Sequence, residues 1–231
     1  MNIYASIKNL TSFEKGLWLL STVLVWGSYA LTNQSDYLTL IASLVGVTAL
    51  IFVAKGDVLG QVLTIVFGII YGIISYRFRY YGEIITYLGM TAPIALLSVI
   101  TWLKHPYAKQ EVKISEVTKK QGIILLVVTL VVTIALGYVL IQLGTSNIEF
   151  SIISIATSFL ASSLMMLRSH YYALAYAAND IILIVLWTLA SMSDVMYLPM
   201  VICFVVFLIN DLYGFFNWKR MKHYQQEAEA V

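Results

Sequence analysis

The sequence predicts an all-α integral membrane protein with eight transmembrane helices. Of its 231 residues, 60% are hydrophobic and only 11% are charged, whereas soluble domains carry about 25% charged residues. Long apolar runs recur along the chain, and none alternates as the strands of a membrane β-barrel do. Lipid offers no water to open backbone groups, so such runs are expected to be helical.

The predicted spans follow the chain in order, and the first two are the shortest. They are Gly16–Leu31, Leu38–Ala54, Val58–Tyr76, Glu83–Leu103, Gln121–Leu143, Ile148–Leu167, Tyr171–Ala190 and Val195–Phe216. The single cysteine, Cys203, excludes a disulfide within the chain. The three histidines lie at or beyond span ends, so neither a metal site nor a cofactor is expected.

The basic residues indicate how the chain is oriented. With the N-terminus inside, twelve of the fourteen Lys and Arg residues fall on the cytoplasmic side, and only Arg77 and Arg79 fall outside. Cytoplasmic loops carry an excess of Lys and Arg. Both termini are therefore expected in the cytoplasm.

One long loop, His105–Lys120, divides the chain into two similar sets of three spans. In each set the last span carries a proline and ends in a tryptophan with basic neighbours. A single helix between the sets gives both the same orientation, which is a parallel repeat. The expected division is an extra N-terminal helix (1–35), a first triplet (36–105), a loop and linker helix (106–145), a second triplet (146–222) and a tail (223–231).

Asn179 and Asp180 are the most informative residues, because they lie in the middle of the seventh span. A carboxylate at the centre of a bilayer costs roughly 2.5–3.5 kcal/mol on insertion scales. Such a residue normally faces a partner or a water-filled cavity, and transporter sites of repeat proteins lie at the repeat interface near the midplane. This pair therefore predicts a solute pathway.

Other candidates follow from helical spacing. Tyr176 and Trp187 share a face of the seventh span with the Asn179–Asp180 pair, and Asn210 and Tyr213 form a second stripe in the eighth. Rings would stack on a flat heterocycle, and amides and carboxylates would bond hydroxyls and ring nitrogens. The predicted substrate-binding set is Tyr176, Trp187 and Tyr213 for stacking, Asp180, Asn179 and Asn210 for hydrogen bonds, and Tyr87 and Thr91 in the fourth span.

Structural explanations compete with each of these roles. Asp180 has the alternative of bonding a serine of the bundle, and Asn210 that of bonding a neighbouring helix. Asp211 is near enough to the interface to pair with Lys219 or Arg220. Trp102 and Trp218 fit an aromatic belt at the membrane surface. The serines of the sixth span favour helix packing.

Several ordered motifs resemble the PnuC family of vitamin and nucleoside transporters. They are Tyr81-Gly82-Glu83, Pro93 and Trp102-Leu103-Lys104-His105 in the fourth span, the Leu186-Trp187 end of the seventh, and Asn210-Asp-Leu-Tyr213-Gly214-Phe-Phe-Asn217-Trp218-Lys219 in the eighth. The resemblance implies a three-plus-one-plus-three fold like that of a full-length SWEET transporter. It also implies uptake of nicotinamide riboside by facilitated diffusion, trapping of the product by a cytoplasmic kinase, and assembly as a homotrimer.

Three positions depart from the pattern that the resemblance implies for nicotinamide riboside carriers. Tyr87 and Ala95 stand where an Asn and a Gln are usual, and Asp180 stands where an Asn is expected. Thiamine, riboflavin and deoxynucleosides therefore remain alternative substrates within the family. An enzyme or sensor is a further alternative, but no nucleophile with its base is present, so catalysis is not expected. The mechanism expected is alternating access of the two triplets around a central site.

Overall fold

A computed structural model of the chain describes residues 3–32, 37–77, 80–107, 111–145 and 147–229. Arg79 and Lys109, which entered the charge count, lie outside these ranges. The described chain is helical apart from its connections and one isolated bridge between Pro106 and Val112. Its elements are α1 (Ile3–Lys8), α2 (Ser12–Leu31), α3 (Tyr37–Ala54), α4 (Val58–Arg77), α5 (Tyr81–Ile84), the π-helix η1 (Ile85–Thr91), α6 (Ala92–Lys104), α7 (Lys119–Gln142), α8 (Ile148–Met166), α9 (Tyr172–Ser193), the 3₁₀ turn η2 (Val195–Tyr197) and α10 (Leu198–Glu229).

Seven helical segments of the described chain are long and apolar enough to cross a membrane, with α5, η1 and α6 counting as one. They match the second to eighth predicted spans closely. The first predicted span forms the 20-residue helix α2, which begins with a Thr11–Glu14 capping box but is not among the seven. The helical class is as predicted, while the count that length and hydropathy support is seven.

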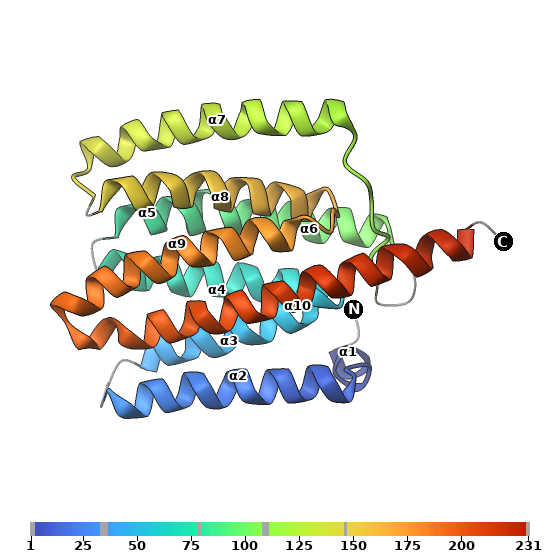
Figure 1. The fold of residues 1–231 in the computed structure, drawn as a ribbon, viewed down its shortest axis with the longest axis horizontal. Coiled ribbons are helices and arrows are strands. Elements are labelled where there is room, and N and C mark those ends of the chain that lie inside the picture. The colour runs from blue at the N-terminus through green and yellow to red at the C-terminus, as the bar shows by residue number, and fades with distance from the viewer. Residues whose placement is uncertain (1–2, 33–36, 78–79, 108–110, 146, 230–231) are drawn as a thin grey trace.

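The long helices lie side by side in one bundle (Figure 1). Helix α7 lies along one edge, where it packs on α8, and α2 lies along the other edge, where it packs on α3 and α10. Only 11% of the apolar window of α7 is buried. The helices α3, α4, α6, α8, α9 and α10 make up the interior between these edges.

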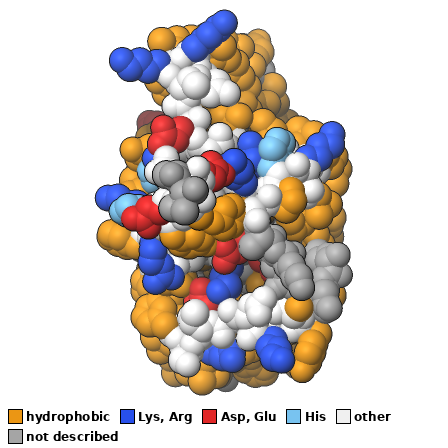
Figure 2. Space-filling model, turned by 90° about the vertical axis from the view of Figure 1, so that its right-hand side faces the viewer, with side chains coloured by type: hydrophobic (Ala, Val, Ile, Leu, Met, Phe, Trp, Pro, Cys, Tyr) orange, Lys and Arg blue, Asp and Glu red, His pale blue; other side chains and the backbone are white. Residues whose placement is uncertain are grey.

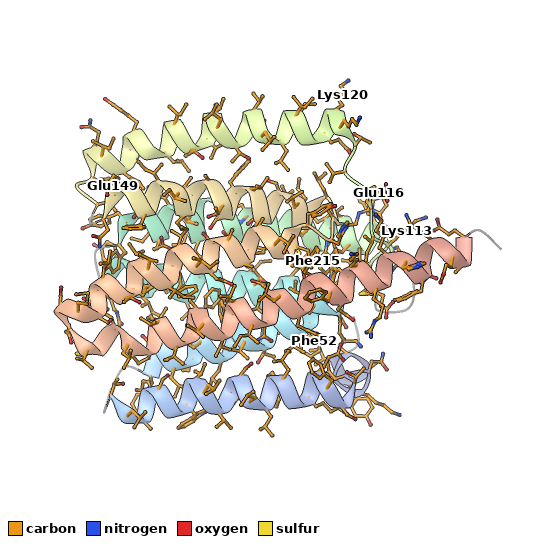
Figure 3. All side chains as sticks on the ribbon, in the orientation of Figure 1. Phe52, Lys113, Glu116, Lys120, Glu149 and Phe215 are labelled. Carbon is orange, nitrogen blue, oxygen red and sulfur yellow. The ribbon has the colours of Figure 1, made fainter. Side chains whose placement is uncertain are left out.

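The two ends of the bundle differ in charge. Both termini and the segment after α6 lie at one end, here called the terminal end (Figure 1). Lys, Arg, Asp and Glu side chains gather on that end, with hydrophobic side chains along the flanks (Figure 2). Figure 3 places Lys113, Glu116 and Lys120 there, and Glu149 at the opposite end. Lys113 and Lys120, which are predicted to be cytoplasmic, thus lie at the same end as the two termini (Figure 3).

Two corners at the terminal end have the same backbone hydrogen bonds. Between α3 and α4, Gly56 N–H donates to Val53 O (2.8 Å) and Asp57 N–H donates to Phe52 O (2.9 Å). Between α8 and α9, Arg168 and Ser169 donate in the same way to Met165 and Leu164 (both 2.9 Å). In each corner one residue has a left-handed backbone conformation, with φ of 68° at Gly56 and 59° at Arg168. This conformation costs nothing for glycine and is uncommon for arginine.

Two tryptophans link these corners reciprocally. Trp102 at the end of α6 donates to Met165 O (3.2 Å), and Trp218 in α10 donates to Val53 O (2.9 Å). Their ring centroids lie 5.4 Å apart, and both side chains are buried. The prediction of an aromatic belt is therefore wrong for this pair, because the indole N–H groups satisfy buried helix-end carbonyls.

The fourth span contains a π-helix that the sequence reasoning missed. Pro93 has no N–H, and a proline ring clashes with the carbonyl four residues earlier. The preceding turns widen, so that Ala92 N–H bonds Tyr87 O, five residues back. Such π segments are rare and are frequent at functional sites.

Helix α10 continues well beyond its predicted end at Phe216. Its polar extension holds the segment between α6 and α7, because Gln225 bonds both Ile114 N–H (2.9 Å) and Val112 O (3.1 Å). Lys222 lies 2.5 Å from the Glu116 carboxylate, and its ammonium holds the pKa of Glu116 below its usual value. The region predicted as a tail from residue 223 is thus helical as far as Glu229.

Candidate functional site

A cavity of about 50 Å³ lies between two groups of helices. The first group is α3, α4 and the span formed by α5, η1 and α6, and the second group is α8, α9 and α10. It is lined by residues of α3, α4, η1, α8, α9 and α10, and by none of α2 or α7 among those described. Its lining residues are Gly46, Ala49, Leu50, Val53, Thr64, Phe67, Tyr87, Thr91, Met165, Tyr176, Asn179, Asp180, Phe207 and Asp211. Drug-sized ligands occupy pockets of about 300–1,000 Å³, so this cavity must widen to admit a nucleoside.

Hydroxyl groups of α8 hold Asn179 in place. The Oδ1 atom of Asn179 accepts hydrogen bonds from Ser154 (3.2 Å), Thr157 (2.9 Å) and Ser158 (3.0 Å). Asn179 is 1% exposed. The serines of α8 do pack helices together, as one reading of the sequence had it, and in doing so they orient a side chain of the cavity.

Tyr176 is held by the same face of α8, because its hydroxyl lies 2.9 Å from Ser162 Oγ. Tyr176 and Asn179 are one turn apart on α9 and both line the cavity. The predicted face of the seventh span is therefore the face that meets the cavity, up to the level of Asp180.

Asp180 and Asp211 face each other across the α9–α10 contact. Each side chain is 3% exposed, and the two carboxyl groups lie within hydrogen-bonding reach of each other. The prediction that Asp211 pairs with Lys219 or Arg220 is wrong, since Asp211 points into the bundle. A hydrogen bond between two carboxyl groups needs a proton on one of them, because an ionised carboxylate only accepts.

The first group of helices supplies mainly aromatic wall. Tyr87 and Thr91, both predicted, lie on η1, where the wider turn presents them to the cavity. The Phe67 ring makes two edge-to-face contacts, one with Tyr87 at a centroid distance of 5.6 Å and one with Phe207 at 5.5 Å. The hydroxyl of Thr91 is buried and has no hydrogen-bond partner among the described residues.

Trp187 lies outside the cavity lining, toward the end opposite the termini. Its indole N–H donates to the Tyr71 hydroxyl (3.0 Å), and its ring packs on Tyr80 at 4.9 Å and Tyr197 at 5.8 Å. Tyr71 in turn contacts Tyr87, with centroids 4.4 Å apart. This aromatic cluster separates the cavity from the turns at the opposite end.

Asn210 and Tyr213 turn toward α2 and away from the cavity. Asn210 donates to Ser21 Oγ (3.0 Å), and Tyr213 donates to Glu14 Oε1 (2.9 Å), while Lys55 lies 3.2 Å from Glu14 Oε2. The alternative in which Asn210 bonds a neighbouring helix is confirmed. Asn210 and Asp211 are adjacent on α10, and of the two only Asp211 lines the cavity.

Sequence reasoning missed Asp211, Phe67 and Phe207 as lining residues. Phe67 and Phe207 carry no polar signal and are typical of any helix interior. Asp211 carried a signal, since a second carboxylate in a span is as costly as the first. Its distance from the end of α10 was underestimated because the helix continues beyond Phe216.

Comparisons with known proteins agree on one family. A family model described as nicotinamide mononucleotide transporter matches residues 36–220. The chain is 26% identical over 217 residues to a protein of Neisseria mucosa named nicotinamide riboside transporter PnuC, covering 91% of this chain and 82% of that protein. A Haemophilus influenzae protein of the same name is 24% identical over 210 residues, covering 89% of each chain.

A solved structure shows the same fold. It is described as the crystal structure of the vitamin B3 transporter PnuC, and it superposes with a TM-score of 0.81 at 24% identity. The match covers 94% of both chains. It therefore includes the helices around the cavity as well as those at the two edges.

Proposed function

This chain belongs to the nicotinamide mononucleotide transporter family, whose model covers residues 36–220, and we propose that it imports nicotinamide riboside or a related nucleoside or vitamin. The protein is a multi-pass membrane protein with seven segments able to span the bilayer. Relatives that match over most of its length are named nicotinamide riboside transporters. A bacterial inner membrane location with both termini in the cytoplasm completes the proposal.

The observation that carries this proposal is the cavity shared by the two groups of three helices. Aromatic rings and amide, carboxyl and hydroxyl groups converge on it from six elements. Ligand sites combine apolar and aromatic walls with a few placed polar groups. Of the predicted binding residues, Asp180, Asn179, Tyr176, Tyr87 and Thr91 line it, and we propose that these contact the solute.

We propose alternating access as the mechanism, with the two triplets (36–105 and 146–222) rocking around the cavity as parallel repeats. The matching corners at Gly56 and Arg168 and the reciprocal Trp102 and Trp218 bonds support this division. The small cavity volume supports a conformation closed around the site, with the Trp187 cluster as a barrier on one side. Helix α2 would be the eighth span, outside both repeats.

Transport by facilitated diffusion requires no energy source, and a cytoplasmic kinase that phosphorylates the product would make uptake unidirectional. Purified protein in liposomes tests this. Labelled nicotinamide riboside should enter with saturable kinetics until the inner and outer concentrations are equal. Protein-free liposomes provide the control. Encapsulated riboside kinase and ATP should raise the trapped label above that level, and accumulation without the kinase would overturn facilitated diffusion. Native mass spectrometry tests the proposed homotrimer.

Thiamine, riboflavin and deoxynucleosides are the second set of candidate substrates. Tyr87 is the reason to retain these compounds as candidates, because it places a phenol ring in the cavity wall where the family pattern suggests an amide. Competition against labelled nicotinamide riboside in the same liposomes ranks the candidates. A thiamine effect stronger than that of unlabelled nicotinamide riboside would reassign the substrate and keep the carrier function. Failure of every candidate to enter would reject the transport proposal.

A further inference from the structure

The Asp180–Asp211 pair gives the cavity a defined charge. The two carboxyl groups lie within hydrogen-bonding reach and are almost fully buried. Like charges at this separation cannot both be ionised in a low-dielectric site, so the pair holds at least one proton. A pair that holds one proton carries a net charge of about −1.

No neighbouring group cancels this charge. The described residues that line the cavity include no Lys, Arg or His. The titratable groups that face the pair are the phenols of Tyr87, Tyr172 and Tyr176 and the thiol of Cys203. Phenols and thiols are uncharged at neutral pH unless strongly perturbed toward ionisation. Asp180 Oδ2 is buried and receives no hydrogen bond from the described hydroxyl, amide or backbone donors.

Aromatic rings surround the same space. Phe67, Tyr87, Tyr176 and Phe207 all line the cavity with the carboxyl pair. The face of an aromatic ring attracts a cation, and cages of such rings are the usual means of binding quaternary nitrogen. Gly46 is required for this arrangement, because a Cβ there would lie 2.4 Å from Phe207 Cζ and 3.0 Å from Phe67 Cδ2.

A polar group is also left without a partner in the wall. Thr91 is 3% exposed, lines the cavity and has a buried hydroxyl with no hydrogen-bond partner among the described residues. Unsatisfied buried hydroxyls are costly, and each one in a native protein requires an explanation. A bound solute with an acceptor or donor group would satisfy it.

We propose that this site selects a monovalent organic cation with a flat, quaternised ring nitrogen, bound between the aromatic rings and balanced by the Asp180–Asp211 pair. The inference rests on the proposed function and narrows its substrate class. A pyridinium riboside and a thiazolium compound satisfy the rule, whereas riboflavin and deoxynucleosides, which carry no fixed positive charge, do not. A cation of charge +1 would balance the single negative charge of the pair, so that neither charge is left unpaired in the membrane.

Two forms of one solute test the charge rule without altering the protein. Nicotinamide riboside carries a pyridinium cation, and its reduced dihydropyridine form is uncharged and nearly the same in shape. Calorimetry on the purified full chain should show the cationic form binding at least about tenfold tighter, a factor equal to about 1.4 kcal/mol. Equal affinity for the two forms would overturn the proposal, as would tighter binding of the uncharged form.

Variants locate the effect. The double variant Asp180→Asn/Asp211→Asn removes the charge, whereas either single Asn variant leaves one carboxylate. The double variant should weaken binding of the cationic form about tenfold and leave the reduced form within about threefold of the parent. Asp57→Asn is the matched control, since it removes another buried carboxylate that caps α4 at Leu59 (2.9 Å) and lies outside the cavity. An unchanged preference in the double variant would count against the pair as the origin of selectivity.

The two proposals fail in different ways. If neither riboside form nor any other candidate binds or enters liposomes, the transporter function and the charge rule fall together. If uncharged solutes are bound and carried as well as cationic ones, only the charge rule falls. If the double variant does not fold, the comparison of the two riboside forms on the parent protein still decides the matter.

Discussion

The first and second groups of helices have matching corners and reciprocal tryptophan bonds, here called the frame, and they differ in the residues that line the cavity. Counting from Gly56 in one corner and Arg168 in the other, Val53 matches Met165, Thr64 matches Tyr176, and Phe67 matches Asn179. All six residues line the cavity. The same count matches Asp180 with Gly68, and counting back from the tryptophans matches Asp211 with Ala95.

The two groups contribute different kinds of side chain to the cavity. Every carboxyl group of the cavity belongs to the second group, while the first supplies aromatic wall and the π-helix. Matching corners with different lining residues would suit the solute that we propose, because its two ends differ in chemistry. This difference also separates two kinds of substitution, those that change the lining and those that change the frame.

The largest effect is expected from removing one carboxyl of the lining. Asp211→Leu leaves Asp180 buried without its partner, and leaving a buried polar group unpaired costs about 1–3 kcal/mol. Solute uptake into liposomes should fall below about a tenth of the parent value, because the binding site and its charge are both altered. Asp211→Asn retains a hydrogen-bonding side chain and should keep more activity. Full uptake by Asp211→Leu would show that the pair has no part in transport.

The frame is tested by the two reciprocal tryptophans. Trp102→Phe and Trp218→Phe each remove one N–H donor from a helix-end carbonyl, which keeps its backbone hydrogen bond from Arg168 or Gly56, at a cost of about 0.5–1.5 kcal/mol. Both variants should lower the thermal unfolding temperature in detergent by similar amounts. A large loss in one and none in the other would break the equivalence of the two corners.

The double variant sharpens that comparison. The two rings contact each other at 5.4 Å, and residues in contact usually couple by about 0.5–3 kcal/mol. The combined loss of stability should therefore differ from the sum of the two single losses. Strict additivity would mean that the two bonds act independently.

The frame was more predictable from the sequence than the lining. Length and hydropathy located the boundaries of seven spans to within a few residues, except the end of α10, since a bilayer fixes how long an apolar helix must be and says nothing of a polar extension. The cost of a carboxylate in lipid identified Asp180. The choice between Asn210 and Asp211 depends on the rotation of α10 about its axis, and contacts with Glu14 and Ser21 of α2 set that rotation. These contacts join residues that are almost two hundred positions apart in the sequence, so no local sequence pattern indicates them.

A smaller effect is expected from Gly46→Ala, which changes the space behind the aromatic wall. The added methyl would displace the Phe207 ring, 2.4 Å away, toward the cavity, and overpacking typically costs about 1–3 kcal/mol. Solute affinity measured by calorimetry should fall several-fold. Gly122→Ala in α7 is the matched control, because nothing lies within 4 Å of the added atom and alanine favours the helix. Equal affinity in both variants would mean that the ring is free to move elsewhere.

The smallest effect is expected from Tyr71→Phe, at the aromatic cluster beyond the cavity. The change removes one oxygen and with it the bond from Trp187, while the ring contacts with Tyr87 and Phe67 remain. The loss of one buried hydrogen bond should cost about 1 kcal/mol in thermal unfolding. Uptake should stay within about threefold of the parent, since the lining is intact. A much larger loss of uptake at unchanged stability would place the Tyr71–Trp187 bond in the transport cycle, and the cluster would then act as a gate rather than as part of the frame.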